Sequence, residues 1–153
     1  ASRGITVSGS PRAAYDSLQG RFGGPGVACV LQEQRPAGRE VIIGQAACPG
    51  LGSLVMFGLG GVFVEVLRDV SFGVAPLSRP DAREMMREIR GARILDGVRG
   101  EPAIDAGAIE TMLCRVARLA VDFPAILEMD LNPVFAYPAG QAPVAVDARI
   151  RIR

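Results

Sequence analysis

Apolar residues recur every three or four positions in three parts of the chain, a spacing that places them on one face of a helix. Each part begins with Ser or Asp, residues that cap helix N-termini, and the first two carry Pro close behind the cap. The expected helices run from Ser10 to about Phe22, from Ser78 to Gly91 and from Asp105 to about Asp122.

Shorter apolar stretches, bounded by Gly and Pro, are typical of strands. They occupy 4–8, 27–34, 40–45, 54–57 and 62–67, and a further extended stretch covers 68–76. Strands and helices do not alternate strictly, and several strands are joined by short turns. This order predicts an α+β fold with a largely antiparallel sheet and helices packed on one side.

Two stretches near the C-terminus, 127–133 and 144–149, alternate in polarity and flank the turn residues 137–140, which predicts a hairpin. Asp130 and Asn132 share one face of the first strand because side chains alternate along a strand. The turn can bring Asp147 beside them on the second strand.

Two carboxylates and an amide oxygen on one sheet face form a cluster of the kind that holds Mg²⁺ against a phosphate. These groups would be costly to bury without a cation to relieve them. The alternative is a polar face exposed to solvent, with no ligand.

Composition excludes several kinds of site. The 153 residues carry a net charge of +1, which does not suggest a nucleic-acid partner, and no apolar run is long enough to span a membrane. All 17 basic residues are arginine. Without His or Lys, this chain holds no Ser/His or Cys/His catalytic pair, no P-loop lysine and no Schiff-base lysine.

The three cysteines, Cys29, Cys48 and Cys114, are far apart in the sequence and form no CxxC motif. We expect neither a disulfide framework nor a zinc site, and we interpret them as small apolar residues in a reducing cytoplasm. The N-terminus has no initiator Met and no targeting signal, which suggests a processed or excised piece.

Two further segments could contact a nucleotide. A glycine loop contains Gly58, Gly60 and Gly61, with Glu65 behind it, and could let backbone N–H groups approach a phosphate. A tight turn or β-bulge is the alternative. Gln32, Glu33 and Gln34 end an apolar stretch, where they could bind a base and ribose hydroxyls or form an ordinary polar strand end.

Eight segments, taken in order, closely resemble the ATP-grasp domain of NDP-forming acyl-CoA synthetases, relatives of succinyl-CoA synthetase β subunits. They are VLQEQ at 30–34, GREVIIG at 38–44, MFGLGGVFVEVLRDV at 56–70, APL at 75–77, DAREM at 81–85, GVRGEP at 97–102, EMDLNP at 128–133 and VDAR at 146–149. The resemblance extends over nearly the whole chain.

The resemblance implies the reaction acyl-CoA + ADP + Pi = acid + CoA + ATP, through acyl phosphate and phosphohistidine. It places Asn132 and Asp147 at positions that hold Mg²⁺ on ATP or ADP. Asp130 matches an acidic position beside the metal and the incoming phosphohistidine loop. Glu33 with its neighbours Gln32 and Gln34 matches the adenine and ribose hinge. The 58–61 loop and Glu65 match further family motifs, which we expect to take part in nucleotide binding.

The family's ATP-grasp domain begins with a subdomain that carries phosphate-binding Lys and, in many members, a His. We therefore expect residues 1–153 to be a partial ATP-grasp domain that lacks this subdomain and is inactive alone. The implied partners are nucleotide and the CoA-binding and ligase domains of a cytoplasmic, oligomeric parent enzyme. The alternative is a non-catalytic regulatory or binding module in an acetyltransferase-fused protein.

Overall fold

The computed structural model describes residues 9–23, 28, 30, 32–61, 69–98 and 100–153. The chain divides into two compact units, Ala1–Pro36 and Ala37–Arg153. The expected strands 4–8 and 62–67, together with Glu65, lie outside the described residues.

The first unit contains helix α1, Pro11–Phe22, with Ser10 as its N-cap and Pro11 in its first turn, as the sequence predicts. The expected strand 27–34 is wrong for its described residues: 28, 30 and 32–34 have no regular secondary structure. An apolar run becomes a strand only when a neighbour pairs with its backbone. The next expected strand along the chain, 40–45, forms its hydrogen bonds with other strands of the second unit.

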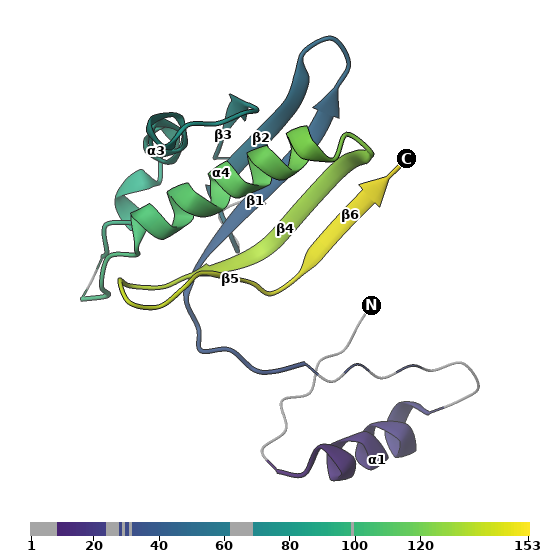
Figure 1. The fold of residues 1–153 in the computed structure, drawn as a ribbon. Helices are drawn as coiled ribbons and strands as arrows, with labels where there is room; N and C mark the ends of the chain where they lie inside the picture. The colour runs from purple at the N-terminus through teal and green to yellow at the C-terminus, as the bar shows by residue number, and fades with distance from the viewer. Residues whose placement is uncertain (1–8, 24–27, 29, 31, 62–68, 99) are drawn as a thin grey trace. The chain divides into compact units, whose positions relative to one another are not determined.

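The second unit is built on an antiparallel sheet (Figure 1). Its strands follow the order β3-β2-β1-β4, with both β5 and β6 paired to β4. The strand bounds are Arg39–Cys48 for β1, Gly52–Leu59 for β2, Val70–Val74 for β3, Ile126–Ala136 for β4, Val144–Ala145 for β5 and Ala148–Ile152 for β6. The expected hairpin near the C-terminus is confirmed, with β4 as its first strand.

Helices α3, Arg79–Glu88, and α4, Ala106–Asp122, pack on one face of this sheet, with the short 3₁₀ helix η1, Ala92–Ile94, after α3. Both helices begin at the predicted caps: the Ser78 Oγ accepts from the N–H of Asp81, and the Asp105 carboxylate accepts from the N–H of Ala108. The α+β fold with helices on one side is therefore confirmed.

Helix α3 ends at Glu88, three residues before the expected end at Gly91. The Asp69 carboxylate accepts hydrogen bonds of 2.7 Å from the backbone N–H groups of Arg90 and of Gly91. These two amides are therefore satisfied outside the helix, and the chain turns away into η1.

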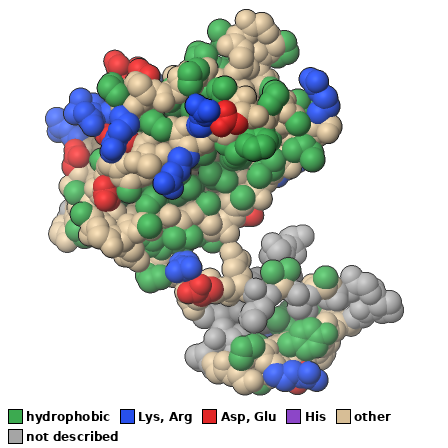
Figure 2. Space-filling model, viewed as in Figure 1, with side chains coloured by type: hydrophobic (Ala, Val, Ile, Leu, Met, Phe, Trp, Pro, Cys, Tyr) green, Lys and Arg blue, Asp and Glu red, His purple; other side chains and the backbone are tan. Residues whose placement is uncertain are grey.

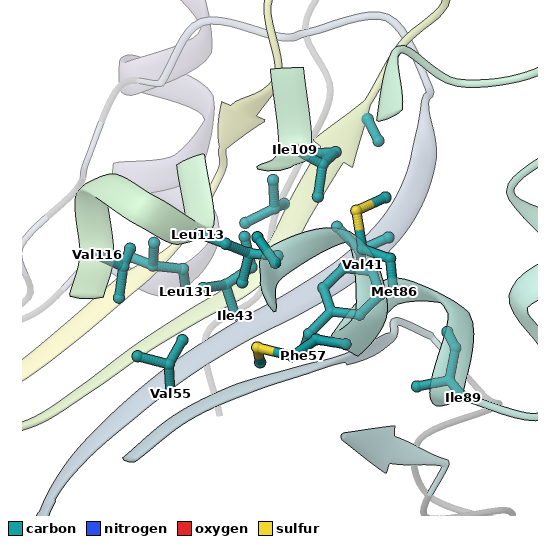
Figure 3. Packing of buried hydrophobic residues seen from close by; sticks show 14 of the residues in the cluster. Val41, Ile43, Val55, Phe57, Met86, Ile89, Ile109, Leu113, Val116 and Leu131 are labelled. Atoms are coloured by element: carbon teal, nitrogen blue, oxygen red, sulfur yellow. The ribbon is translucent and has the colours of Figure 1, made fainter. Parts of the chain in front are cut away.

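The hydrophobic core lies between the helices and the sheet (Figure 3). Leu113 of α4 points toward Ile43 of β1 and Leu131 of β4. Leu113 and Ile43 are fully buried, and Leu131 is nearly so. Because one face of the sheet is covered in this way, the other face, called here the open face, carries the exposed side chains of alternate residues.

Among the helices that the structure describes, none is both long and apolar enough to cross a lipid bilayer.

Candidate functional site

Strand β4 presents the predicted acidic and amide side chains on the open face. Met129 and Leu131 are buried against the helices, whereas Glu128, Asp130 and Asn132 are exposed. Alternation along the strand is therefore as the sequence predicts. The side chains of Asp130 and Asn132 make no hydrogen bond to any described residue, which leaves their oxygen atoms available to a ligand.

Asp147 lies beside Asn132, although it is 15 positions away in the sequence. The backbone N–H of Asn132 donates to the carbonyl oxygen of Asp147 at 3.2 Å, and the N–H of Val146 donates to the carbonyl of Pro133 at 2.9 Å. The Asn132–Pro133 peptide is cis, and the β1–β4 register shifts at this point. The irregular segment between β5 and β6 thus brings Asp147 back to β4.

The Asp147 carboxylate is exposed and is held in place by one local bond. Its Oδ1 accepts from the N–H of Ala148 at 2.8 Å, and its second oxygen has no partner among the described residues. No group of three or more Asp, Glu, His or Cys residues close enough to bind a metal occurs in the described parts of the chain. The cluster therefore offers two carboxylates and one amide, and a bound metal would need further ligands from phosphate or water.

The register of the sheet places Asp130 in a row across the open face. Asp130 lies between Gly44 of β1 and Arg149 of β6, and the row continues through Met56 of β2 to Phe72 of β3. Directly opposite residues in an antiparallel pair have Cβ atoms about 5 Å apart, so these side chains are neighbours. Asp130 consequently stands at the boundary between an apolar half and a charged half of the face.

The parallel row runs through Glu128, which lies between Ala46 and Arg151. The Glu128 carboxylate accepts two bonds from the Arg151 guanidinium, one of them from Nε at 3.1 Å. These hydrogen bonds, together with the charges of Arg151 and Arg149, hold the pKa of Glu128 below its usual value.

The two rows enclose a trough with a volume of about 410 Å³. Its floor is formed by Gly44 and Ala46, whose missing or small side chains leave the middle of the sheet uncovered. A Cβ at Gly44 would lie 3.1 Å from the Met56 Cε atom. The residues that line the apolar side are Leu54, Met56 and Phe72, and those that line the charged side are Glu128, Asp130, Arg149 and Arg151.

A second hollow, of about 380 Å³, lies between α4 and the loop 140–143. Its polar side chains serve the helix itself: Asp105 caps α4, and the Thr111 hydroxyl donates to the carbonyl of Gly107 at 2.8 Å. The trough on the open face is therefore the better candidate site.

The glycines of the predicted loop have structural roles. Gly58 belongs to β2, where a Cβ would lie 2.9 Å from the carbonyl oxygen of Asp69. The N–H of Gly60 donates to the carbonyl of Glu40 at 2.8 Å, and Gly61 adopts a φ of 65°. The Gly60 amide is thus already engaged, which fits a tight turn.

Gln32, Glu33 and Gln34 belong to the first unit and are exposed. The Glu33 carboxylate lies 3.0 Å from a guanidinium nitrogen of Arg35, two residues away. Their role in binding a base or ribose stays a prediction.

The family model for the ATP-grasp domain matches residues 10–152. This chain belongs to the ATP-grasp family. The resemblance found in the sequence segments is therefore confirmed.

The relatives of this ATP-grasp chain include the β subunit of ADP-forming acetate–CoA ligase I from Pyrococcus furiosus, which is 48% identical over 121 residues, 79% of this chain and 51% of the relative. ADP-forming acetate–CoA ligase I from Archaeoglobus fulgidus is 49% identical over 115 residues, 75% of this chain and 17% of the relative. The chain thus spans about half, or less, of the length of these proteins.

Among solved structures, this ATP-grasp chain resembles acetyl-coenzyme A synthetase 1 of Ca. Korarchaeum cryptofilum in complex with coenzyme A and Mg-AMPPCP, with its phosphohistidine segment pointing towards the nucleotide binding site. The TM-score is 0.74 at 51% identity, covering 78% of this chain and 55% of that one. The apo form of the same protein gives a TM-score of 0.81 at 45% identity, covering 93% and 65%.

The sequence interpretation missed the floor and the cationic side of the trough. Gly44 and Ala46 have no side-chain functional group that would mark them as site residues. Arg149 belongs to a segment that matches the family, but the sequence interpretation gave it no function. The spacing of Arg149, two residues after Asp147, was the available signal. Its position opposite Asp130 follows only from the strand register.

Proposed function

We propose that this chain is the nucleotide- and Mg²⁺-binding part of an ADP-forming acyl-CoA synthetase, and that it forms one wall of the nucleotide cleft. The observation that carries the proposal is the trough on the open face, with oxygen ligands beside its charged side. The similarity to ADP-forming acetate–CoA ligases and to a synthetase structure with Mg-AMPPCP supports it.

Asn132 and Asp147 would hold Mg²⁺. Their side chains are exposed, their backbones are hydrogen-bonded to each other, and carboxylate and amide oxygens are the ligands that Mg²⁺ takes. Mg²⁺ keeps several waters and phosphate oxygens, so two protein ligands fit such a site. Bound there, the metal would neutralise negative charge on the nucleotide phosphates.

The remaining residues would position the reactants. The apolar side of the trough can cover part of the nucleotide and exclude water, and Asp130 would face the incoming phosphohistidine. In the proposed transfer, the P–N bond of phosphohistidine breaks and a P–O bond forms to the terminal phosphate oxygen of ADP. The ring nitrogen of the histidine, supplied by another domain, keeps the electron pair of the broken bond and takes up a proton from solvent, which regenerates neutral imidazole.

The parent enzyme would contain the other half of the ATP-grasp domain, which carries the cationic Lys, and the CoA-binding and ligase domains. We accordingly expect this chain alone to bind Mg-ADP weakly or not at all in calorimetry. Tight binding by the chain alone would contradict this half-cleft arrangement.

The test is Asp147→Asn in the intact enzyme. Asparagine keeps an oxygen that can accept from the N–H of Ala148 but removes the charge that binds the metal. We expect Mg²⁺-dependent ATP formation to fall at least 100-fold, with an unchanged unfolding midpoint. Asp122→Asn is the matched control, since Asp122 ends α4 and pairs with Arg118.

Unchanged turnover in Asp147→Asn would refute the metal assignment. An intact wild-type enzyme that binds Mg-ADP but forms no ATP from acyl-CoA, ADP and phosphate would favour the non-catalytic module instead.

A further inference from the structure

Arg149 lines the trough but has no role in the proposed metal site. It lies directly opposite Asp130 in the β4–β6 ladder and lines the charged side of the trough. It is exposed and follows Asp147 by two residues. Arg149 is therefore the cross-strand neighbour of the acidic residue of the proposed transfer site.

The two arginines of the trough differ in how they are engaged. Arg151 is held by Glu128 through a pair of hydrogen bonds from Nε and Nη2. Arg149 makes no side-chain hydrogen bond or ion pair within the described residues. Arg149 acts on Glu128 through its charge alone, so of the two arginines it is the one without a carboxylate hydrogen bond among the described residues.

The charge of the proposed ligand calls for such a cation. Asp130 and Asp147 add two negative charges to those of a nucleotide polyphosphate, and a single Mg²⁺ does not offset the total. No Lys or His is available in this chain, so an arginine must supply the positive charge on this side. A guanidinium also binds phosphate oxygens with two parallel hydrogen bonds, which fixes orientation.

We propose that Arg149 binds the phosphoryl group as it passes between phosphohistidine and the nucleotide, so that Asp130 and Arg149 hold the two partners of the transfer side by side. This inference rests on the proposed function. Under this inference, the open face of the sheet supplies a positive charge to the phosphoryl group through Arg149, in addition to any lysine of the other half of the domain.

A structural role for Arg149 would be an ion pair with Asp130 on the surface. Such exposed pairs contribute little to stability, and a Lys at position 149 would form one equally well. Phosphate binding by the two parallel N–H groups of a guanidinium distinguishes the two residues, because Lys supplies the positive charge but not the paired hydrogen bonds.

The experiment measures ATP formation by the intact enzyme carrying Arg149→Ala, Arg149→Lys or the control Arg118→Ala. Arg118 is an exposed arginine of α4 on the helix side of the sheet. For Arg149→Ala we expect kcat to fall at least 100-fold while the KM for acyl-CoA and the unfolding midpoint stay within twofold. Added guanidinium ion should restore at least a tenth of the lost rate, and Arg149→Lys should be intermediate.

Full activity in Arg149→Ala, or a loss that guanidinium does not rescue and Lys repairs completely, would overturn the inference. The two proposals can fail separately. If Asp147→Asn abolishes turnover and Arg149→Ala does not, the proposed function stands and the inference falls. If neither variant affects turnover, the proposed function itself is refuted.

Discussion

Replacing Leu113 by Ala tests whether the contact of α4 with the sheet stabilises the second unit. Leu113 is fully buried, on the face of α4 that points toward Ile43 and Leu131 (Figure 3). Those neighbours are fixed by the β1–β4 ladder, so they cannot collapse fully into the vacated space.

The expected loss can be worked out from the atoms removed. Leu→Ala deletes three carbon groups, and each is worth about 0.8 kcal/mol of burial, which gives about 2.4 kcal/mol. A residual cavity adds to this, so we expect the free energy of unfolding to fall by about 3–4 kcal/mol. Because domains of this size are stable by about 5–15 kcal/mol, the variant should remain folded but be clearly weakened.

The assay is urea unfolding followed by far-ultraviolet circular dichroism, since the chain contains no Trp. Val121→Ala is the matched control, because Val121 lies on the same helix and is 48% exposed. The m-value should not change, since the same surface is exposed on unfolding. A loss below about 1 kcal/mol, or one equal to that of Val121→Ala, would refute the reasoning.

Three further predictions concern the second unit. Hydrogen bonds from Arg83 lower the pKa of the buried Glu110, so the stability that Glu110 contributes is present above the ordinary pKa of Glu and is lost as pH falls through the lowered value. The difference in the free energy of unfolding between wild type and Glu110→Gln should therefore become smaller from pH 7 to pH 3. A difference that stays constant over this range would contradict the prediction. Ser78→Ala removes the side-chain cap of α3 and should cost about 1 kcal/mol in urea unfolding, with no effect if the cap is dispensable. Gly60→Ala would place a Cβ 2.7 Å from the Cβ of Glu40 and should lower the thermal midpoint, whereas Gly20→Ala, where nothing lies within 4 Å, should not.

Several exposed apolar side chains show that apolar character alone does not identify the core. Figure 2 shows hydrophobic side chains exposed on the surface of the second unit, and Phe123, Ile150 and Ile152 are among its exposed apolar residues. In sequence these residues look like members of a core. Ile150 and Ile152 lie on β6, which pairs only with β4 among the described strands and so forms an edge of the sheet.

Local patterns correctly predicted the elements whose character depends on near neighbours. The capping residues Ser78 and Asp105 identified both helix starts, and alternation along 127–133 identified the strand and its exposed polar face. These features follow from bonds and periodicities that extend over a few residues. The same information could not distinguish the run 27–34 from a strand, because pairing depends on a partner elsewhere in the chain.

The sequence by itself therefore determined the fold class, the family and the three oxygen-bearing residues Asp130, Asn132 and Asp147. Only the tertiary structure decided what surrounds them. The strand order places Gly44 on one side of Asp130 and Arg149 on the other, which creates the trough and gives it a cation. Register is set by hydrogen bonds between strands distant in sequence, and no local periodicity encodes which residues those bonds bring opposite each other.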